Sequence, residues 1–435
     1  MTSEQVFVIV GGGLAGARAA EALRTEGFTG RVVLVAGEQS VPYERPPLSK
    51  GYLQGHEDRD SFDVHPAEWY TEHNIDLLLG ITASAISLRH RQITLADGSV
   101  LTYDRLLLAT GATARRFGGP GADLVGVHHL RSADDSTLLR AALQAGGRRV
   151  VVIGSGWIGL EVAAAAATYG NTVTVLGRGA VPLGSVLGDD AAEVFADLHR
   201  ANGVELWMHS EVAEILGDAH GVTGVLLAGD EQIAADLVVV GFGATPNVQL
   251  ARAAGLDVHD GIRVDAGFQS TDAAVYAVGD VAAVFHPVLG EHRRVDHWAN
   301  ANTAPAFAAR AMLGQAVSYD AIPYFFTDQF DLGMEYSGYP SLTAGAELIV
   351  RGDRPGRKYV AFWLQDSRVV GGMNVNVWDV NDDVQQLIRS GGRVDAARLA
   401  DPQVPLSEIV AEVSTQAPST HAASTDATSF RADTN

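Results

Sequence analysis

Apolar and polar positions near the start of the chain follow two regular patterns in turn. Residues 5–10 form a β-branched apolar run, residues 14–26 carry apolar side chains at helical spacing, and residues 31–36 form a second apolar run. Short apolar runs separated by an amphipathic helix are typical of parallel strands that are buried on both faces. The pattern predicts one strand–helix–strand unit.

The same pattern returns 143 residues later, with a strand over 149–153, an alanine-rich helix over 157–169 and a strand over 172–176. Two mononucleotide-binding units in one chain indicate two dinucleotide-binding domains. Further strand signals at 106–109 and 237–240 end in tight glycine turns. We expect these strands to return to the sheets of the same two domains.

Beyond residue 323 the chain changes to shorter alternating runs, at 347–351, 359–364 and 369–374, which are typical of antiparallel strands. We therefore expect an α/β protein with two Rossmann-like dinucleotide-binding domains and a C-terminal α+β domain. The expected bounds are 1–115 with 242–322 for the first domain, 116–241 for the second, 323–410 for the third and 411–435 for a disordered tail rich in Ser, Thr and Ala.

Composition excludes several function classes. The formal net charge of −21 gives no electrostatic basis for a nucleic-acid partner. No apolar stretch approaches the roughly 18–20 residues of a membrane-spanning helix and no secretory signal opens the chain, so we expect a cytoplasmic protein with no membrane partner. The chain has no cysteine, and its 14 histidines show no ligand spacing, so no metal site is expected; His128 and His129 are better explained as strand surface.

The first strand–helix turn carries the glycine spacing of a dinucleotide-binding fingerprint, at Gly11, Gly13 and Gly16. Such glycines permit a tight turn and a close approach of backbone amides to a pyrophosphate at the helix N-terminus. Glu38 lies 22 residues beyond Gly16, where a carboxylate can accept hydrogen bonds from ribose hydroxyls. The alternative is a glycine-rich turn without a ligand, and the flanking strand and helix argue against it.

The second fingerprint, at Gly154, Gly156 and Gly159, has equally good flanks. Its second strand ends in Gly177-Arg178, which leaves no acid where the first unit has Glu38. Arg178 is either a partner for a 2′-phosphate or only a solvated charge at a strand end. Two such sites predict two different dinucleotides, a tightly held flavin and an exchanging nicotinamide.

Further segments carry a family resemblance: Pro42-Tyr43-Glu44-Arg45-Pro46-Pro47-Leu48-Ser49-Lys50, Ala109-Thr110-Gly111 and Tyr276-Ala277-Val278-Gly279-Asp280. In this order they resemble the FAD-dependent pyridine nucleotide-disulfide oxidoreductases. Within that superfamily the chain is similar to the ferredoxin reductases of bacterial oxygenase systems, of the putidaredoxin reductase and rhodocoxin reductase type, from about residue 5 to residue 410. The resemblance implies FAD in the first domain and NADH or NADPH as substrate in the second.

The resemblance also implies contacts along both cofactors. An aspartate at a strand end suits ribitol hydroxyls, an arginine suits a pyrophosphate, and a tryptophan suits the isoalloxazine ring. Asp280 as a turn or helix cap and Trp298 as ordinary core are the structural alternatives. The expected cofactor-binding residues are Gly11, Gly13, Ala15, Gly16, Glu38, Arg45, Lys50, Ala83, Thr110, Gly111, Arg131, Asp280, Trp298 and Phe326, with Gly154, Gly156, Ile158, Gly159, Arg178 and Gly243.

Phe326 lies in a segment, Phe325 to Gln329, that resembles the family's aromatic-Ser-Asp-Gln segment at the flavin face, although a tryptophan is usual at this position. Stacking survives the change, whereas the indole hydrogen-bond donor is lost. The alternative for the aromatic pair Phe325-Phe326 is the core of a domain interface.

Lys50 is one of only two lysines among 31 basic residues; the other is Lys358. A compact ammonium beside the flavin would stabilise the negative charge that develops when the ring accepts hydride. By the resemblance, Lys50 pairs with Glu161, just after the second fingerprint, and these two are the expected catalytic residues. The alternative for Lys50 is a solvated surface lysine.

Without cysteine the chain cannot reduce disulfides or peroxides through a redox thiol. The leading hypothesis is a ferredoxin reductase, in which FAD takes hydride from NAD(P)H and passes single electrons to an iron–sulfur ferredoxin that feeds a haem monooxygenase or Rieske dioxygenase. One alternative is a flavin reductase that acts directly on a small molecule such as a quinone. Another is a flavin-bound signalling protein whose redox state gates a partner. We expect a monomer or a weak homodimer.

Two finer expectations concern the substrates. Because Gly177 supplies no carboxylate to repel a 2′-phosphate, NADPH is expected to be accepted, with NADH as the preferred donor in the alternative. An acidic ferredoxin is expected to dock through arginines, although each one taken singly is better explained as a solvated charge. The candidates are Arg293, Arg294, Arg310, Arg351, Arg354 and Arg357.

Overall fold

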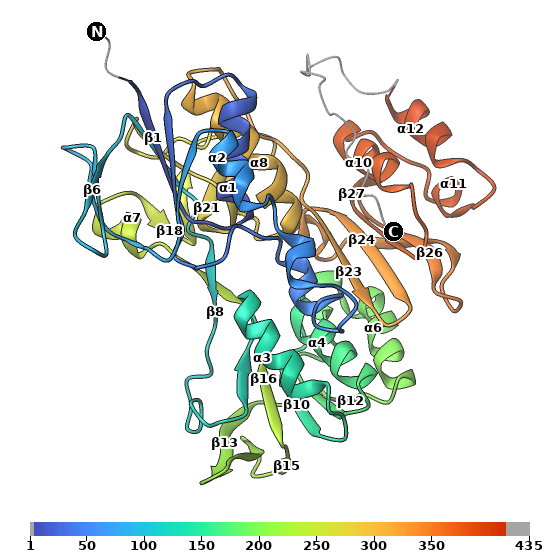
Figure 1. Ribbon diagram of the computed structural model, residues 1–435. Coiled ribbons are helices and arrows are strands. Elements are labelled where there is room, and N and C mark those ends of the chain that lie inside the picture. Colours follow the sequence, from blue (N-terminus) through green and yellow to red (C-terminus); the bar gives the residue numbers. More distant parts are fainter. Residues whose placement is uncertain (1–3, 415–435) are drawn as a thin grey trace.

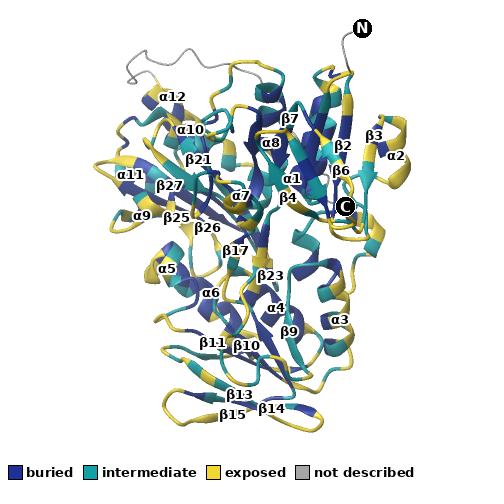
Figure 2. Cartoon of the chain, turned by 90° about the vertical axis from the view of Figure 1, so that its left-hand side faces the viewer, coloured by how far each residue is buried: buried dark blue, intermediate teal, exposed yellow. Residues whose placement is uncertain are grey.

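The computed structural model describes residues 4–414, which form two parallel α/β units and one antiparallel unit. In Figure 1 the first parallel unit lies at the upper left, the second at the bottom, and the C-terminal unit at the right. Buried residues concentrate in the central strands and their covering helices, and exposed residues gather on the outer turns (Figure 2). The expected fold class is confirmed.

The first parallel sheet has the strand order β20-β7-β1-β2-β3. Strands β1 (Val6–Val10) and β2 (Arg31–Val35) pair along their whole length, and α1 (Leu14–Thr25) connects them. Strand β20 (Val275–Ala277) pairs with β7 (Arg105–Leu108), so a late segment completes a sheet that begins at residue 6. This unit is therefore discontinuous in sequence.

The remaining elements of the first unit surround this sheet. They are η1 (Pro46–Ser49), η2 (Arg59–Phe62), α2 (Ala67–Glu72), β3 (Ile75–Leu78), β4 (Ala83–Ser87), β5 (Gln92–Leu95), β6 (Val100–Thr102), β8 (Ala112–Ala114), β17 (Ala244–Pro246), α7 (Gln249–Ala253), β18 (Val258–His259), β19 (Gly261–Val264), η3 (Gly279–Val281), β21 (Ala282–His286), β22 (Glu291–Arg294) and α8 (Trp298–Met312). Helix α8 packs on α1, and β17 pairs with β8 where the chain crosses between the two parallel units.

The second parallel sheet has the order β12-β11-β10-β16-β9 and repeats the first unit. Strands β10 (Arg149–Ile153), β11 (Thr172–Leu176) and β16 (Leu237–Val240) have the bounds that the apolar runs predict, and α4 (Trp157–Thr168) ends one residue early. The other elements are β9 (Val127–His129), α3 (Ala133–Leu143), α5 (Gly184–Leu187), α6 (Asp189–Ala201), β12 (Glu205–Trp207), β13 (Val212–Asp218), β14 (Gly221–Leu227) and β15 (Gln232–Ala234).

The C-terminal unit is an antiparallel sheet of order β23-β24-β27-β26-β25 with both faces covered. Along β26 (Lys358–Gln365), Val360 and Phe362 pack under the C-terminal helices, while Tyr359 and Trp363 join the core shared with the second unit. This alternation is the two-residue period of a strand. The other elements are β23 (Tyr324–Gln329), β24 (Leu332–Gly338), α9 (Pro340–Thr343), β25 (Glu347–Asp353), β27 (Arg368–Val375), α10 (Asn381–Ser390), α11 (Ala396–Ala400) and α12 (Leu406–Ser414).

Helix α12 extends past residue 411, where the composition predicts that the tail begins. Residues 411–414 continue α12, because Ile409, Val410 and Val413 are buried in the cluster beneath that helix. The rest of the expected tail, 415–435, lies outside the described residues.

Candidate active site

A single cavity of about 1680 Å³ lies where the three units meet, and both glycine turns open into it. Every residue expected to bind a cofactor lines this cavity except Gly16 and Gly159. The C-terminal unit contributes Phe325 and Phe326, so all three units form its wall. The volume exceeds the roughly 300 to 1,000 Å³ of ordinary small-molecule sites, so the cavity has room for more than one small ligand.

The first glycine of each turn has a backbone conformation that favours glycine. Gly11 has φ +125° and Gly154 has φ +119°. A Cβ added at Gly11 would lie 2.0 Å from the carbonyl oxygen of Ala109, and one at Gly154 would lie 2.5 Å from that of Gly241. Gly16 and Gly159 are not cavity residues because each packs against the carbonyl of the first glycine of its own turn.

Gly13 and Gly156 differ from their neighbours because no atom lies within 4 Å of the Cβ that either would carry. Each stands at the cap of a helix, α1 or α4, and each lines the cavity. Open space in front of helix N-terminal amides fits a pyrophosphate that approaches the backbone closely. The two turns therefore fit two dinucleotides.

Glu38 is held beside the first turn by two side chains from the loop before η1. The Tyr43 hydroxyl donates to Oε2 at 2.5 Å, and Nη2 of Arg45 lies 3.2 Å from Oε1. Burial raises the pKa of Tyr43 to about 12, so its hydroxyl stays protonated and remains a donor at neutral pH. These contacts hold the carboxylate of Glu38 at the cavity wall, where it can accept from ribose hydroxyls.

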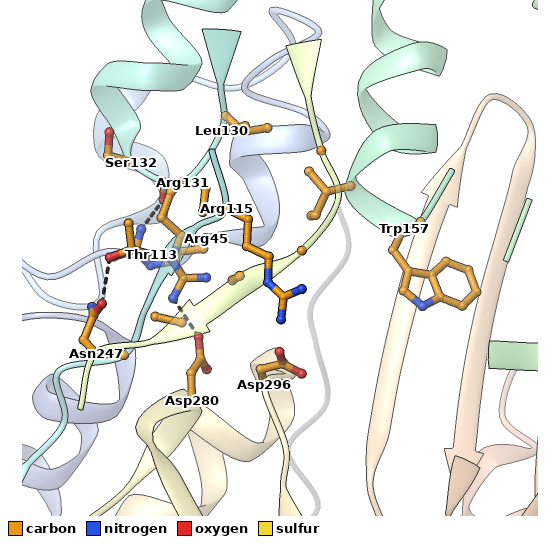
Figure 3. A pocket seen from close by; sticks show the side chains of 18 of the residues that line it. Arg45, Thr113, Arg115, Leu130, Arg131, Ser132, Trp157, Asn247, Asp280 and Asp296 are labelled. Atoms are coloured by element: carbon orange, nitrogen blue, oxygen red, sulfur yellow. Dashed lines mark hydrogen bonds and ion pairs between the residues drawn. The ribbon is translucent and has the colours of Figure 1, made fainter. Parts of the chain in front are cut away.

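Arg131 and Asp280 face each other inside the cavity (Figure 3). Nη2 of Arg131 lies 2.6 Å from Oδ2 of Asp280, and Arg45 donates to the carbonyl oxygen of Arg131. Nε of Arg131 is buried without a hydrogen-bond partner. An unsatisfied guanidinium N–H that borders a cavity fits a ligand with phosphate oxygens, because leaving such a donor unpaired costs about 1–3 kcal/mol.

Lys50 and Glu161 form an ion pair on the wall of the same cavity. Nζ of Lys50 lies 2.7 Å from Oε1 of Glu161, and the two side chains are only 14% and 3% exposed. Glu161 lies on α4 of the second unit and Lys50 follows η1 of the first. Lys50 is thus neither solvated nor a surface residue, and its ammonium lies 5.2 Å from the ring centroid of Phe326.

Trp298 begins α8 and packs edge-on against Phe326, with ring centroids 5.9 Å apart. Its indole N–H donates to Oε2 of Glu44 at 3.1 Å. Burial raises the pKa of Glu44, and Arg18 and Trp298 oppose that shift. Trp298 is therefore a cavity-wall residue fixed by a hydrogen bond, and its ring packs against that of Phe326.

Arg178 follows the end of β11, and it is exposed and lies on the cavity wall with Ile158 and Gly243. Gly177 is buried against Met208 and Ser155, and a Cβ added there would lie 2.5 Å from Cε of Met208. The position that lacks a carboxylate, Gly177, therefore has little room for a side chain. A larger residue at this position would displace its neighbours.

Some site residues were missed by the sequence interpretation. Asn247 joins the two crossover strands, because its Oδ1 accepts from Thr113 and its amide donates to the carbonyl of Thr110 (Figure 3). Arg115 also lines the cavity. Arg115 directly follows β8, which pairs antiparallel with β17, so the rule for the ends of parallel strands gave no signal for it.

The arginines considered for docking all have internal partners. Arg293 pairs with Glu291, and Arg351 donates to main-chain carbonyls after α11. The remaining ion pairs are Arg294 with Asp260 and Asp296, Arg310 with Glu26, Arg354 with Asp190 and Arg357 with Asp331. The six arginines are therefore weaker sources of attraction than free cations.

Two kinds of feature are absent from residues 4–414. No group of three or more His, Asp or Glu side chains in this range is placed to hold a metal ion. Within the same range no helix combines the length and apolarity needed to cross a membrane. His128 and His129 lie on β9 and are half-buried, and burial lowers the pKa of both.

Comparison with known proteins matches two family models. Residues 6–304 match the pyridine nucleotide-disulphide oxidoreductase family, and residues 324–410 match the reductase C-terminal family. The chain is 40% identical to the ferredoxin--NAD(+) reductase component of an anthranilate 1,2-dioxygenase system from Burkholderia cepacia, over 93% of this chain and 99% of that protein. It is 37% identical to rhodocoxin reductase from Rhodococcus erythropolis, over 85% of this chain and 86% of that protein.

A solved structure is similar over nearly the whole chain. The covalent putidaredoxin reductase–putidaredoxin complex contains a chain that matches with a TM-score of 0.89 and 33% identity, covering 95% of this chain and 99% of that one.

Proposed function

Because this chain belongs to the pyridine nucleotide-disulphide oxidoreductase family, we propose that it is the ferredoxin reductase of an oxygenase system, with FAD as cofactor, NAD(P)H as hydride donor and an iron–sulfur ferredoxin as electron acceptor. FAD, when bound, would accept a two-electron hydride and release electrons singly, which nicotinamide cannot do. The family name refers to disulfides, but a chain without cysteine has no thiol for that chemistry.

One observation carries the proposal: two matched glycine turns open into one cavity, and the largely buried Lys50–Glu161 ion pair lines the same cavity. Each turn supplies helix N-terminal amides and open space for a pyrophosphate. The ammonium of Lys50 would supply a fixed positive charge that stabilises the negative charge a flavin gains on accepting hydride. Glu161 keeps that ammonium in place through their contact.

The residues of the wall divide into two sets by position. Glu38, Arg131 and Asp280 would hold FAD at its ribose, pyrophosphate and ribitol, while Trp298 and Phe326 would border its ring. The second set lines the part of the cavity at α4 and would hold the nicotinamide nucleotide: Gly154, Gly156, Ile158, Arg178 and Gly243.

Several finer points belong to the same proposal. NADPH is accepted beside NADH, because nothing at Gly177 repels a 2′-phosphate. The FAD-binding domain comprises 1–115 and 242–322, the NAD(P)-binding domain 116–241 and the C-terminal domain 323–410. The protein works in the cytoplasm as a monomer or weak homodimer.

The flavin assignment is tested by releasing the cofactor. Acid precipitation of the purified protein, followed by chromatography of the supernatant, should recover about one FAD per chain, since no cysteine offers a thioether link. Anaerobic addition of NADH or NADPH to the intact protein should bleach the flavin absorbance. Recovery of FMN, or of no flavin, would refute the proposal.

A further inference from the structure

Glu161 accepts more hydrogen bonds than its pairing with Lys50 requires. Oε2 accepts from the hydroxyl of Ser49 at 2.5 Å, and Oε1 accepts from Lys50 at 2.7 Å and from the hydroxyl of Thr327 at 2.6 Å. Thr327 lies on β23, in the C-terminal unit. The carboxylate is therefore held by side chains from two units besides its own.

Thr327 is the first of three fully buried polar residues that form a chain of hydrogen bonds. Nε2 of Gln329 lies 3.1 Å from Oγ1 of Thr327, and Oε1 of Gln329 lies 2.9 Å from Nε2 of His199 on α6. All three residues have a relative exposure of 0%. Because successive side chains of β23 point to opposite faces of the sheet, Thr327 and Gln329 point inward on the same face, toward the second unit.

The ion pair at one end fixes the direction of every bond in this chain. A carboxylate only accepts, so the single hydroxyl proton of Thr327 goes to Glu161 and its oxygen must accept from Gln329. The Gln329 amide group then points to Thr327 and its carbonyl oxygen to His199, which must donate from Nε2. The opposite orientation of Gln329 would take the Thr327 proton away from Glu161.

His199 can donate in this way as a neutral imidazole. Burial lowers its pKa to about 4, so the ring carries one N–H at neutral pH. That proton is on Nε2, because Nδ1 is buried and has no hydrogen-bond partner. Phe330 packs edge-on against the ring, with centroids 5.2 Å apart, and helps to hold its orientation.

We propose that His199 and Gln329 are positioning residues that keep the Thr327 hydroxyl aimed at Glu161, and that Glu161 thereby holds the Lys50 ammonium at its place in the cavity. The proposal rests on the proposed function, because the position of Lys50 matters for hydride transfer. It connects α6, which does not line the cavity, to the reacting end of the site.

The first test compares variants of the holoenzyme by stopped-flow flavin reduction at saturating NADH. Gln329→Leu should slow reduction about tenfold with little change in the apparent affinity for NADH, because the Thr327 hydroxyl that donates to the charged Glu161 loses the partner that orients it. His199→Leu should slow it several-fold, whereas His199→Gln, whose amide can donate from the same place, should stay within about twofold of the wild type. The flavin midpoint potential should fall in the two leucine variants only.

His286→Leu is the matched control. His286 is also buried and joins two units through Tyr339, with 3.3 Å between Nε2 and the hydroxyl oxygen, yet it does not line the cavity or contact the chain to Glu161. His286→Leu should lower the melting temperature and leave the rate of flavin reduction unchanged. Equal rates in His199→Leu, Gln329→Leu and the wild type would overturn the proposal, as would equal losses in His199→Gln and His199→Leu.

A second readout does not depend on activity. In ¹⁵N NMR of histidine-labelled protein, the resonances that disappear in His199→Gln should report a neutral ring protonated at Nε2 between about pH 6 and pH 8. Protonation at Nδ1, or a charged ring, would overturn the proposal. If the wild-type flavin is not reduced by either nucleotide, the proposed function fails. The spectrum still decides whether His199 donates from Nε2 to Gln329.

Discussion

The two lysines of this chain offer a matched pair of residues. Lys50 is paired with Glu161 in the cavity, and Lys358 begins β26 on the surface. Lys50→Met keeps the length of the side chain and removes its charge, so FAD should stay bound while flavin reduction slows roughly 100-fold. In Lys358→Met the flavin should be reduced at the wild-type rate. Stopped-flow absorbance measures both, and an unchanged rate in Lys50→Met would show that its charge has no part in hydride transfer.

A substitution of Arg178 tests whether this single residue determines the choice between NADPH and NADH. Arg178→Ala should lower kcat/KM for NADPH about tenfold and leave that for NADH within about twofold, because only NADPH has a 2′-phosphate for a charge-assisted hydrogen bond. Gly177→Glu is the poorer probe, since its side chain would collide with Ser155 and Met208. Equal losses with both donors would indicate that Arg178 contacts something common to them.

Among the elements, equivalent substitutions in the two strand–turn–helix units test which dinucleotide each unit binds. Gly13 and Gly156 have φ values of −85° and −87°, which any residue adopts, and open space where a Cβ would be placed. Gly13→Ala should therefore fold normally and lose most of its FAD. Gly156→Ala should keep FAD and show a KM for NAD(P)H raised about tenfold or more. Flavin content, melting temperature and steady-state kinetics distinguish the two, and full FAD content in Gly13→Ala would contradict the assignment of the first unit.

Most elements were predictable because their signal is local. The buried strands β10, β11 and β16 are continuous apolar runs with glycine turns at their ends, and the structure keeps their predicted bounds. The hydrogen-bond chain from His199 to Glu161 was not predictable in this way. It joins α6 to β23 across 130 residues, and only the packing of the C-terminal sheet on the second unit brings them together. The glycine turns could be found from spacing, whereas Glu161 required the family resemblance.

At the scale of the whole molecule, the internal pairing of arginines changes the expectation for ferredoxin docking. Candidates such as Arg310 and Arg357 are neutralised by acidic neighbours, and the chain carries a net charge of −21. Long-range attraction of an acidic ferredoxin should therefore be weak. We expect turnover to change less than about threefold as the Debye length shrinks from about 10 to 3 Å. A steep fall in a salt titration of ferredoxin-dependent turnover would indicate free basic charge at the docking surface.

Carrier-dependent reduction of cytochrome c distinguishes a ferredoxin reductase from a reductase that acts directly on small molecules. The purified protein is mixed with NADH or NADPH and cytochrome c, with and without putidaredoxin or another ferredoxin from an oxygenase system. The proposed activity predicts slow cytochrome c reduction without a ferredoxin and a rate that rises and saturates when one is added, and Lys50→Met should lower that rate. Rapid turnover of a quinone, together with cytochrome c reduction that no ferredoxin in the panel accelerates, would contradict it.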